Sequence, residues 1–128
     1  MPMFKDFDGW NKRKKEINEH PSPLFNENEI WGCFLGVNIG SEQDGKAERF
    51  MRPVLIIKKF NKDVFWGLPL THSFKSNPYY HRLSHNSESN LCLSQLKLID
   101  AKRLSHMRGK ITSIESNIIK EKLRKLLF

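Results

Sequence analysis

Between residues 29 and 99, short apolar runs alternate with clusters of turn-forming residues, and no segment of helical length separates them. The runs read EIWGCFLGV, RPVLIIKKF, DVFWGLPLT, PYYHRLSH and SNLCLSQLKLI. Strands joined by short turns, such as the turns at 61–63 and 86–87, pair antiparallel. About five strands in about 75 residues predict a mainly β protein, folded as a small barrel or curled sheet that leaves few strand edges exposed.

Helical patterns flank this region. Residues 4–18 place Phe4, Phe7, Trp10 and Ile17 at helical spacing, with lysines on the opposite face, which predicts an amphipathic helix. The segment 19–28 contains two prolines and reads as a linker. We therefore expect a helical extension and linker at 1–28 and one domain at 29–128.

The C-terminal segment predicts a second helix of about four turns. Thr112 and Glu115 have the spacing of a capping box. The apolar stripe that follows contains Ile114, Ile118, Ile119, Leu123, Leu126 and Leu127.

The net charge is +8, and the C-terminal quarter carries most of it. Residues 97–128 contain nine Lys or Arg against three acidic side chains. A field of this sign favours nucleic acid or an acidic protein as partner. Solubility alone is the other interpretation of this charge.

The cysteines and histidines show no metal-ligand spacing. Cys33 and Cys92 lie inside apolar runs, so we expect buried free thiols. His81 and His85 are predicted to be half-exposed strand positions. We expect neither a metal nor another cofactor. No apolar run has signal-peptide or membrane-spanning length, which predicts a cytoplasmic protein without membrane contact.

Several polar residues stand where apolar strands meet loops. Arg52 opens VLII, Thr71 and Ser73 follow WGLPL, and Ser94 and Gln95 follow NLCL. Such positions in a small barrel can hold side chains rigidly toward a ligand. Two structural alternatives stay open, because Thr71 could cap its strand and Arg52 could be a surface cation that covers its neighbours. Before Arg52, the polar loop with Gly40 and Gly45 is long enough to be functional or disordered.

Four motifs follow one another over about residues 28–127: a G-x-E-Q-x-G loop, an Arg-Pro strand start, a P-x-T strand end, and L-x-Q-L-K-x-x-D followed by K-R-L. In this order the sequence resembles the MazF/PemK family of toxin–antitoxin ribonucleases. The resemblance implies an SH3-like barrel of the MazF/PemK (CcdB-like) type with a C-terminal helix. It also implies a homodimer and metal-independent cleavage of single-stranded RNA at short sequences. The N-terminal helix lies outside the family core.

The resemblance assigns Arg52 and Thr71 as catalytic residues. The substrate-binding candidates are Gly40, Ser41, Glu42, Gln43, Ser73, Phe74, Tyr79, Ser94, Gln95 and Lys97. Among them, Phe74 and Tyr79 are aromatic side chains on which RNA bases could stack. The chain departs from some family members, which have His at the position of Ser41 and Asp at that of Ser94.

The resemblance further implies an acidic antitoxin as partner, with operator DNA bound only as the toxin–antitoxin complex. Two other functions stay open. One is a gyrase-directed binding module on the same barrel, as in CcdB-type toxins. The other is an inactive relative that only binds RNA.

Overall fold

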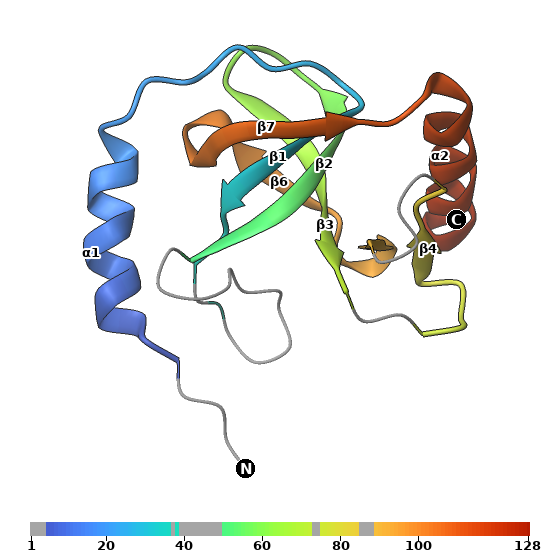
Figure 1. Cartoon of the computed structure of the whole chain (residues 1–128), viewed down its shortest axis with the longest axis horizontal. Coiled ribbons are helices and arrows are strands. Elements are labelled where there is room, and N and C mark those ends of the chain that lie inside the picture. Colours follow the sequence, from blue (N-terminus) through green and yellow to red (C-terminus); the bar gives the residue numbers. More distant parts are fainter. Residues whose placement is uncertain (1–4, 37, 39–49, 73–74, 85–88) are drawn as a thin grey trace.

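The computed structural model describes residues 5–36, 38, 50–72, 75–84 and 89–128. Within these residues the chain forms two α-helices, seven strands and two short 3₁₀ turns (Figure 1). In chain order they are α1 (Phe7–Asn18), β1 (Glu29–Phe34), β2 (Met51–Lys59), β3 (Val64–Thr71), β4 (Tyr80–Arg82), β5 (Asn90–Cys92), η1 (Leu93–Gln95), β6 (Lys97–Asp100), η2 (Ala101–Arg103), β7 (Leu104–Lys110) and α2 (Ser113–Leu127). The predicted order of a helix, a set of strands and a final helix is confirmed.

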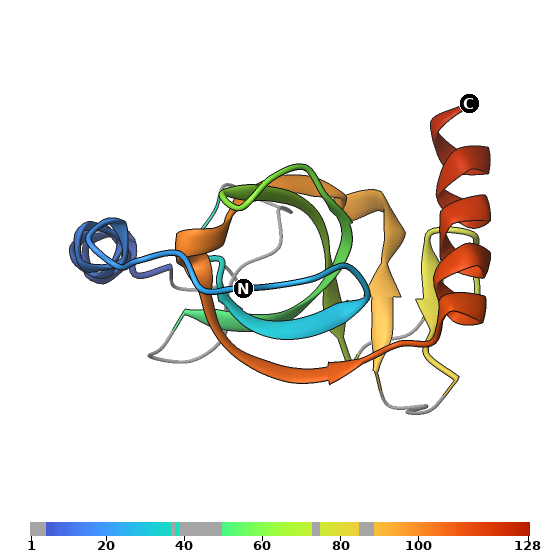
Figure 2. The same cartoon turned by 90° about the horizontal axis from the view of Figure 1, so that it is seen from above.

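The seven strands form one antiparallel sheet in the order β4-β5-β3-β2-β1-β7, with β6 paired to the first half of β3. Seen from above, the sheet curls into a ring, with α1 and α2 attached on opposite sides (Figure 2). Among the described residues, no pairing joins β7 to β4 or β6, so hydrogen bonds do not close the ring. The mainly β, barrel-like fold is thus confirmed as a curled sheet that stays open.

Strand β2 is apolar on both faces because each face is covered. Successive side chains of a strand point to opposite sides. Val54 and Ile56 join a cluster inside the curled sheet, whereas Leu55 and Ile57 join a second cluster that includes residues of α2. The uninterrupted run RPVLII follows from this double burial.

Two features of the sheet differ from the predicted strands. The run at 89–99 is divided, because η1 interrupts it between β5, which pairs with the end of β3, and β6, which pairs with its start. Strand β7 was not predicted. Five of its seven residues are exposed, so its sequence LSHMRGK lacks the apolar alternation that marks a half-buried strand.

Helix α1 begins at Phe7, later than the predicted start at residue 4, because Asp6 caps it. The Asp6 carboxylate accepts a hydrogen bond from the Gly9 amide at 2.9 Å. Phe7 is 51% exposed, so its predicted place on a buried stripe is wrong. Phe4 lies outside the described residues.

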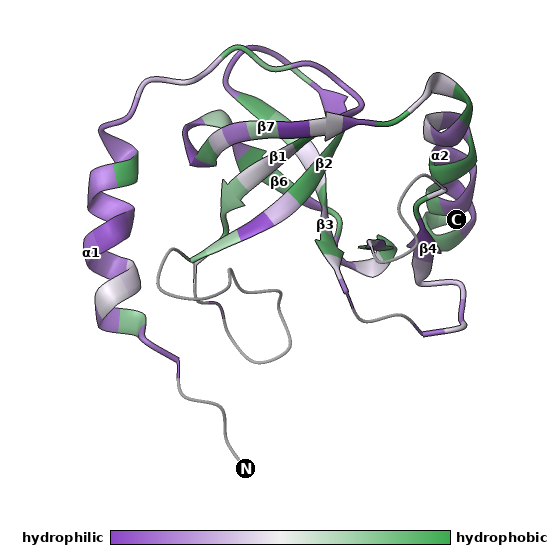
Figure 3. Ribbon diagram, in the orientation of Figure 1, coloured by the Kyte–Doolittle hydropathy of each residue, from purple (hydrophilic) through white to green (hydrophobic). Residues whose placement is uncertain are grey.

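The buried contact of α1 rests on two side chains, Trp10 and Ile17, which pack with Phe34 of β1. Most of the helix is hydrophilic (Figure 3). Gly36 has φ +74°, and a Cβ there would lie 1.8 Å from the Trp10 ring. This backbone conformation favours glycine, and the missing side chain leaves room for the indole.

The segment 19–28 contains neither helix nor strand, yet its second half belongs to the core. Phe25 is 1% exposed and packs on Phe65 with ring centroids 5.3 Å apart. The division of the chain at residue 28 stays a prediction.

Helix α2 is capped by Thr112, whose hydroxyl accepts from the Glu115 amide at 3.1 Å. Of the predicted apolar stripe, Ile119 and Leu123 are buried and Leu126 is partly buried. Three members of the stripe are exposed instead: Ile114, Ile118 and Leu127. The helix touches the sheet along a narrower line than its apolar stripe, because it lies beside only one edge of the ring (Figure 2).

Replacing Leu123 by Ala should lower the free energy of unfolding by about 2–5 kcal/mol, since it removes a buried side chain and leaves a cavity. Ile114→Ala, at a position 74% exposed on the same helix, is the matched control and should change it by no more than about 0.5 kcal/mol. Urea denaturation measures both values. Equal losses for the two variants would contradict the observed orientation of α2.

Candidate active site

The pairing of β2 with β3 brings the two predicted catalytic residues together. Val54 pairs with Pro69 in this antiparallel ladder. Arg52 comes two residues before Val54 on β2, and Thr71 comes two residues after Pro69 on β3, so both stand at the same end of this strand pair. Both residues line one small pocket of about 60 Å³. Its other lining residues are Pro53, Leu70, His72 and Ser89.

Arg52 is held firmly in this pocket. The residue is 8% exposed, and its Nη1 donates to the carbonyl of Leu70 at 2.9 Å. The interpretation of Arg52 as a surface cation is therefore wrong. A guanidinium presents five N–H donors in a planar fork, which suits an oxyanion.

Thr71 ends β3 and is half-buried. Asn90, which pairs with it from β5, is 1% exposed, and its Nδ2 lies 3.4 Å from the carbonyls of both Thr71 and His72. These long contacts support the backbone at the strand end. Asn90 is missing from the predicted site, although an asparagine beside the apolar run LCL was a signal for it.

Four further predicted residues lie outside the lining of this pocket. Ser94 and Gln95 belong to η1, and the amide of Leu93 at its start donates to the Tyr79 carbonyl at 2.8 Å. Tyr79 is 51% exposed, and Lys97 is half-buried at the start of β6. The other predicted substrate-binding residues lie outside the described part of the chain: Gly40, Ser41, Glu42, Gln43, Ser73 and Phe74.

Cys33 pairs with Arg52 from the neighbouring strand β1, but it is not a nucleophile. Burial raises the pKa of its thiol to about 12, although the charges of Arg103 and Lys97 oppose this effect. The thiol therefore stays protonated and inert. Cys33 and Cys92 are both buried and free, as predicted.

Within the described residues, no three His, Cys, Asp or Glu side chains come close enough together to hold a metal ion. In the same part of the chain, no helix combines the length and the apolar character needed to cross a membrane.

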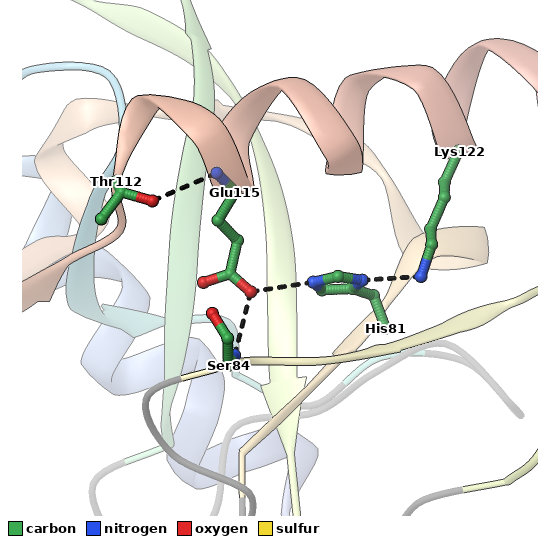
Figure 4. A network of polar contacts seen from close by, with 5 residues as sticks. All are labelled: His81, Ser84, Thr112, Glu115 and Lys122. Carbon is green, nitrogen blue, oxygen red and sulfur yellow. Dashed lines mark hydrogen bonds and ion pairs between the residues drawn. The ribbon is translucent and has the colours of Figure 1, made fainter.

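A polar network centred on the buried residues His81 and Glu115 fastens β4 to α2 (Figure 4). Lys122 Nζ lies 2.8 Å from His81 Nδ1, and because an ammonium only donates, Nδ1 accepts. The His81 proton is then on Nε2, which donates to Glu115 Oε2 at 3.1 Å. The same oxygen accepts from the Ser84 amide at 2.9 Å. The predicted capping box is thus only half formed, since the Glu115 carboxylate bonds to β4 and its neighbour rather than to Thr112.

The prediction that His81 is half-exposed is wrong. The residue is 7% exposed, because α2 covers this side of β4. His85 lies outside the described residues.

Burial alone would raise the pKa of Glu115, but the hydrogen bonds from Ser84 and His81 outweigh it and hold the pKa below its ordinary value of 4.5. The carboxylate is therefore charged at neutral pH. It anchors β4, which pairs with β5 and so with Asn90, the partner of Thr71.

Comparison with family models matches residues 26–127 to the family described as PemK-like, MazF-like toxin of type II toxin-antitoxin system. The match covers well over half of the chain. The protein belongs to the MazF/PemK family. No curated protein matches the sequence.

The fold agrees with solved MazF/PemK structures. MazF from Deinococcus radiodurans superposes with a TM-score of 0.63 at 15% identity, covering 82% of this chain and 97% of that one. An endoribonuclease from a mycobacterial species, in complex with its cognate antitoxin, gives 0.61 at 14% identity, covering 81% and 95%. Mycobacterium tuberculosis toxin MazF-mt6 gives 0.60 at 14% identity, covering 77% and 95%. At these identities the likeness establishes the MazF/PemK fold.

Because the pKa of Glu115 is lowered in the folded protein, the stability that this carboxylate contributes depends on pH in a known direction. The stability from its charged form is complete above the pKa of the unfolded chain and is lost as the pH falls through the lower pKa of the folded protein. Glu115→Gln should therefore cost about 1.5–3 kcal/mol of unfolding free energy at neutral pH. The difference from the unchanged protein should shrink toward about pH 3.

Urea denaturation at both pH values measures this difference. Glu121→Gln, at an exposed position of the same helix, is the control and should stay close to the unchanged protein. A Glu115→Gln effect that is equal at both pH values would contradict the charged network.

Proposed function

We propose that this MazF/PemK protein is the toxin of a type II toxin–antitoxin system and acts as an endoribonuclease on single-stranded RNA. The observation that carries the proposal is the buried Arg52 guanidinium in one pocket with Thr71. Solved structures of the same fold include endoribonucleases. Cleavage of messenger RNA by the free toxin would inhibit translation and growth.

The proposed reaction uses the RNA's own 2′-hydroxyl as nucleophile. The 2′-oxygen loses its proton and forms a bond to the adjacent phosphorus, while the bond from phosphorus to the 5′-oxygen breaks and that oxygen takes up a proton. The products are a 2′,3′-cyclic phosphate and a 5′-hydroxyl. Since the nucleophile is already tethered, the enzyme has mainly to align it and to stabilise charge. No metal is needed for these steps.

Arg52 stabilises the transition state in this proposal. Negative charge gathers on the phosphoryl oxygens as the 2′-oxygen attacks, and a fixed guanidinium meets that charge without having to reorganise. It also shields the leaving 5′-oxygen. Thr71 contributes one neutral hydrogen bond to the same oxygens. DNA lacks the 2′-hydroxyl and could be bound but not cut in this way.

Substrate binding is proposed for the residues around the pocket. Tyr79 is exposed enough for a base to stack on its ring. Ser94 and Gln95 can hydrogen-bond base edges, and the Lys97 ammonium can contact a phosphate. The loop of Gly40, Ser41, Glu42 and Gln43, together with Ser73 and Phe74, completes the proposed set.

The proposed partner is an acidic antitoxin that folds across the basic surface of a toxin homodimer and blocks access to RNA. One solved relative is in complex with its cognate antitoxin, and MazF from Deinococcus radiodurans has been solved together with MazE. Operator DNA would be bound only by the toxin–antitoxin complex. The proposed location is the cytoplasm.

Replacing Arg52 by Ala should lower the rate of RNA cleavage about a hundredfold or more, as for the loss of an oxyanion donor. Arg52→Lys should recover little activity, because an ammonium keeps the charge but loses the planar fork. Thr71→Ala should be milder, since it removes one neutral donor. The measurement is single-turnover cleavage of a short RNA, with circular dichroism to check that each variant folds.

Arg108→Ala, at an exposed arginine of β7, is the matched control and should cut at close to the original rate. A folded Arg52→Ala protein that also cuts at the original rate would remove Arg52 from the chemistry. The gyrase-directed binding module would then be the better interpretation of the pocket.

A further inference from the structure

A second, larger pocket of about 360 Å³ lies between α1 and η2, away from the pocket that contains Arg52. Four of its lining residues are cations: Lys14 and Lys15 from α1, and Lys102 and Arg103 from η2. Asp100 is the single acidic residue in the lining. We call this pocket the α1–η2 groove.

The two cations on η2 have structural partners and fixed positions. Lys102 Nζ donates to the Asn18 carbonyl at the end of α1, at 3.2 Å. Arg103 Nη1 donates to the Phe34 carbonyl at 3.1 Å. These contacts tie α1 to the sheet, and they explain Lys102 and Arg103 without any ligand.

Lys14 and Lys15 have no such explanation. Both are exposed, and within the described residues neither takes part in a hydrogen bond or ion pair. They add two charges to a groove that already contains two cations. Like charges gathered around a cavity repel one another, so an anionic ligand would stabilise this arrangement.

The remaining lining residues distinguish between anions. Asn11 and Asn18 carry carboxamides, which both donate and accept. Asp100 carries a carboxylate, of which Oδ1 accepts from the Lys102 amide at 2.9 Å and Oδ2 is the acceptor for a ligand. A nucleotide uses all three kinds of group, because its phosphate needs cations and its base edge needs donors and acceptors. An acidic peptide has no use for the Asp100 carboxylate, which would repel it. The mixed lining therefore favours a nucleotide.

Strand pairing connects one edge of the groove to Arg52. Leu104, which follows the lining residue Arg103, pairs with Cys33 of β1, and Cys33 pairs with Arg52 of β2. Two inter-strand steps, about 10 Å, separate the backbone of Leu104 from that of Arg52. A single RNA strand of several nucleotides could extend from the groove along this edge to the Arg52 pocket.

We propose that the α1–η2 groove is a second RNA-binding site, which holds a nucleotide of the same single strand a short distance from the cleaved bond. The proposal rests on the proposed ribonuclease function and adds to it a role for α1. The matched family region starts at residue 26, so α1 lies outside it and the groove is an addition to the common domain.

The test uses Lys14→Gln/Lys15→Gln in the chain of residues 1–128. Lys120→Gln/Lys125→Gln on α2 removes the same charge from exposed positions elsewhere and is the control. Binding is measured by fluorescence anisotropy with 2′-O-methyl RNA, which lacks the nucleophile, at lengths of about four and about twelve nucleotides.

The groove variant should bind the longer RNA several-fold more weakly and the shorter one unchanged. For this variant, the slope of log K against the logarithm of the salt concentration should be shallower by about 1.4. Each phosphate contact to a single strand contributes about 0.7 to that slope, and the variant removes two lysines. The control should match the original protein at both lengths. No effect of the groove variant, or an equal loss in the control, would overturn the proposal, as would failure of the original protein to bind the longer RNA.

Two further measurements separate this proposal from the ribonuclease function. If the protein binds the longer RNA through the groove but does not cut unmodified RNA, the catalytic proposal fails and the groove assignment stands. If it cuts RNA but the groove binds a poly-glutamate peptide and no RNA, the second RNA site is refuted and the groove is a protein-binding surface.

Discussion

The Arg52 guanidinium is buried at the start of β2 and donates to the Leu70 carbonyl of the neighbouring strand at 2.9 Å. Removing a cation from water is costly unless polar groups compensate, and the Leu70 carbonyl is one such group. Strands β2 and β3 are apolar on both faces and pack into two clusters, which fixes the backbone on either side of the guanidinium. Arg52 is therefore held in one place, in the small pocket that it lines together with Thr71.

Both helices support these strands, from opposite sides of the curled sheet (Figure 2). On one side, Ile119 and Leu123 of α2 pack against the sheet, and Glu115 binds the segment around β4 through His81. On the other side, Trp10 of α1 packs on β1. The end of the sheet with Arg52 and Thr71 is therefore supported on both sides. This matters for the proposed catalysis, because the positions of reacting groups depend on rigid elements.

The strands and site residues that could be predicted are those marked by the order of apolar and polar residues along a short stretch of sequence. The apolar runs predicted β2 and β3, and the polar residues at their ends pointed to Arg52 and Thr71. The burial of His81 was not predictable, because it depends on Glu115, 34 residues away in sequence. Strand β7 was missed because it is held by pairing with β1, while its side chains are mostly exposed. Likewise, the apolar spacing of α2 did not reveal that Ile114 faces solvent, since only the docking of the helix decides that.

The proposed site promotes attack by the RNA's own 2′-hydroxyl without a metal. The most direct test is mass spectrometry of the fragments produced from a defined single-stranded RNA by the purified protein in EDTA. We expect fragments with 2′,3′-cyclic phosphate and 5′-hydroxyl ends. Fragments with 3′-hydroxyl and 5′-phosphate ends, or cleavage that stops in EDTA and returns with a divalent ion, would contradict this mechanism.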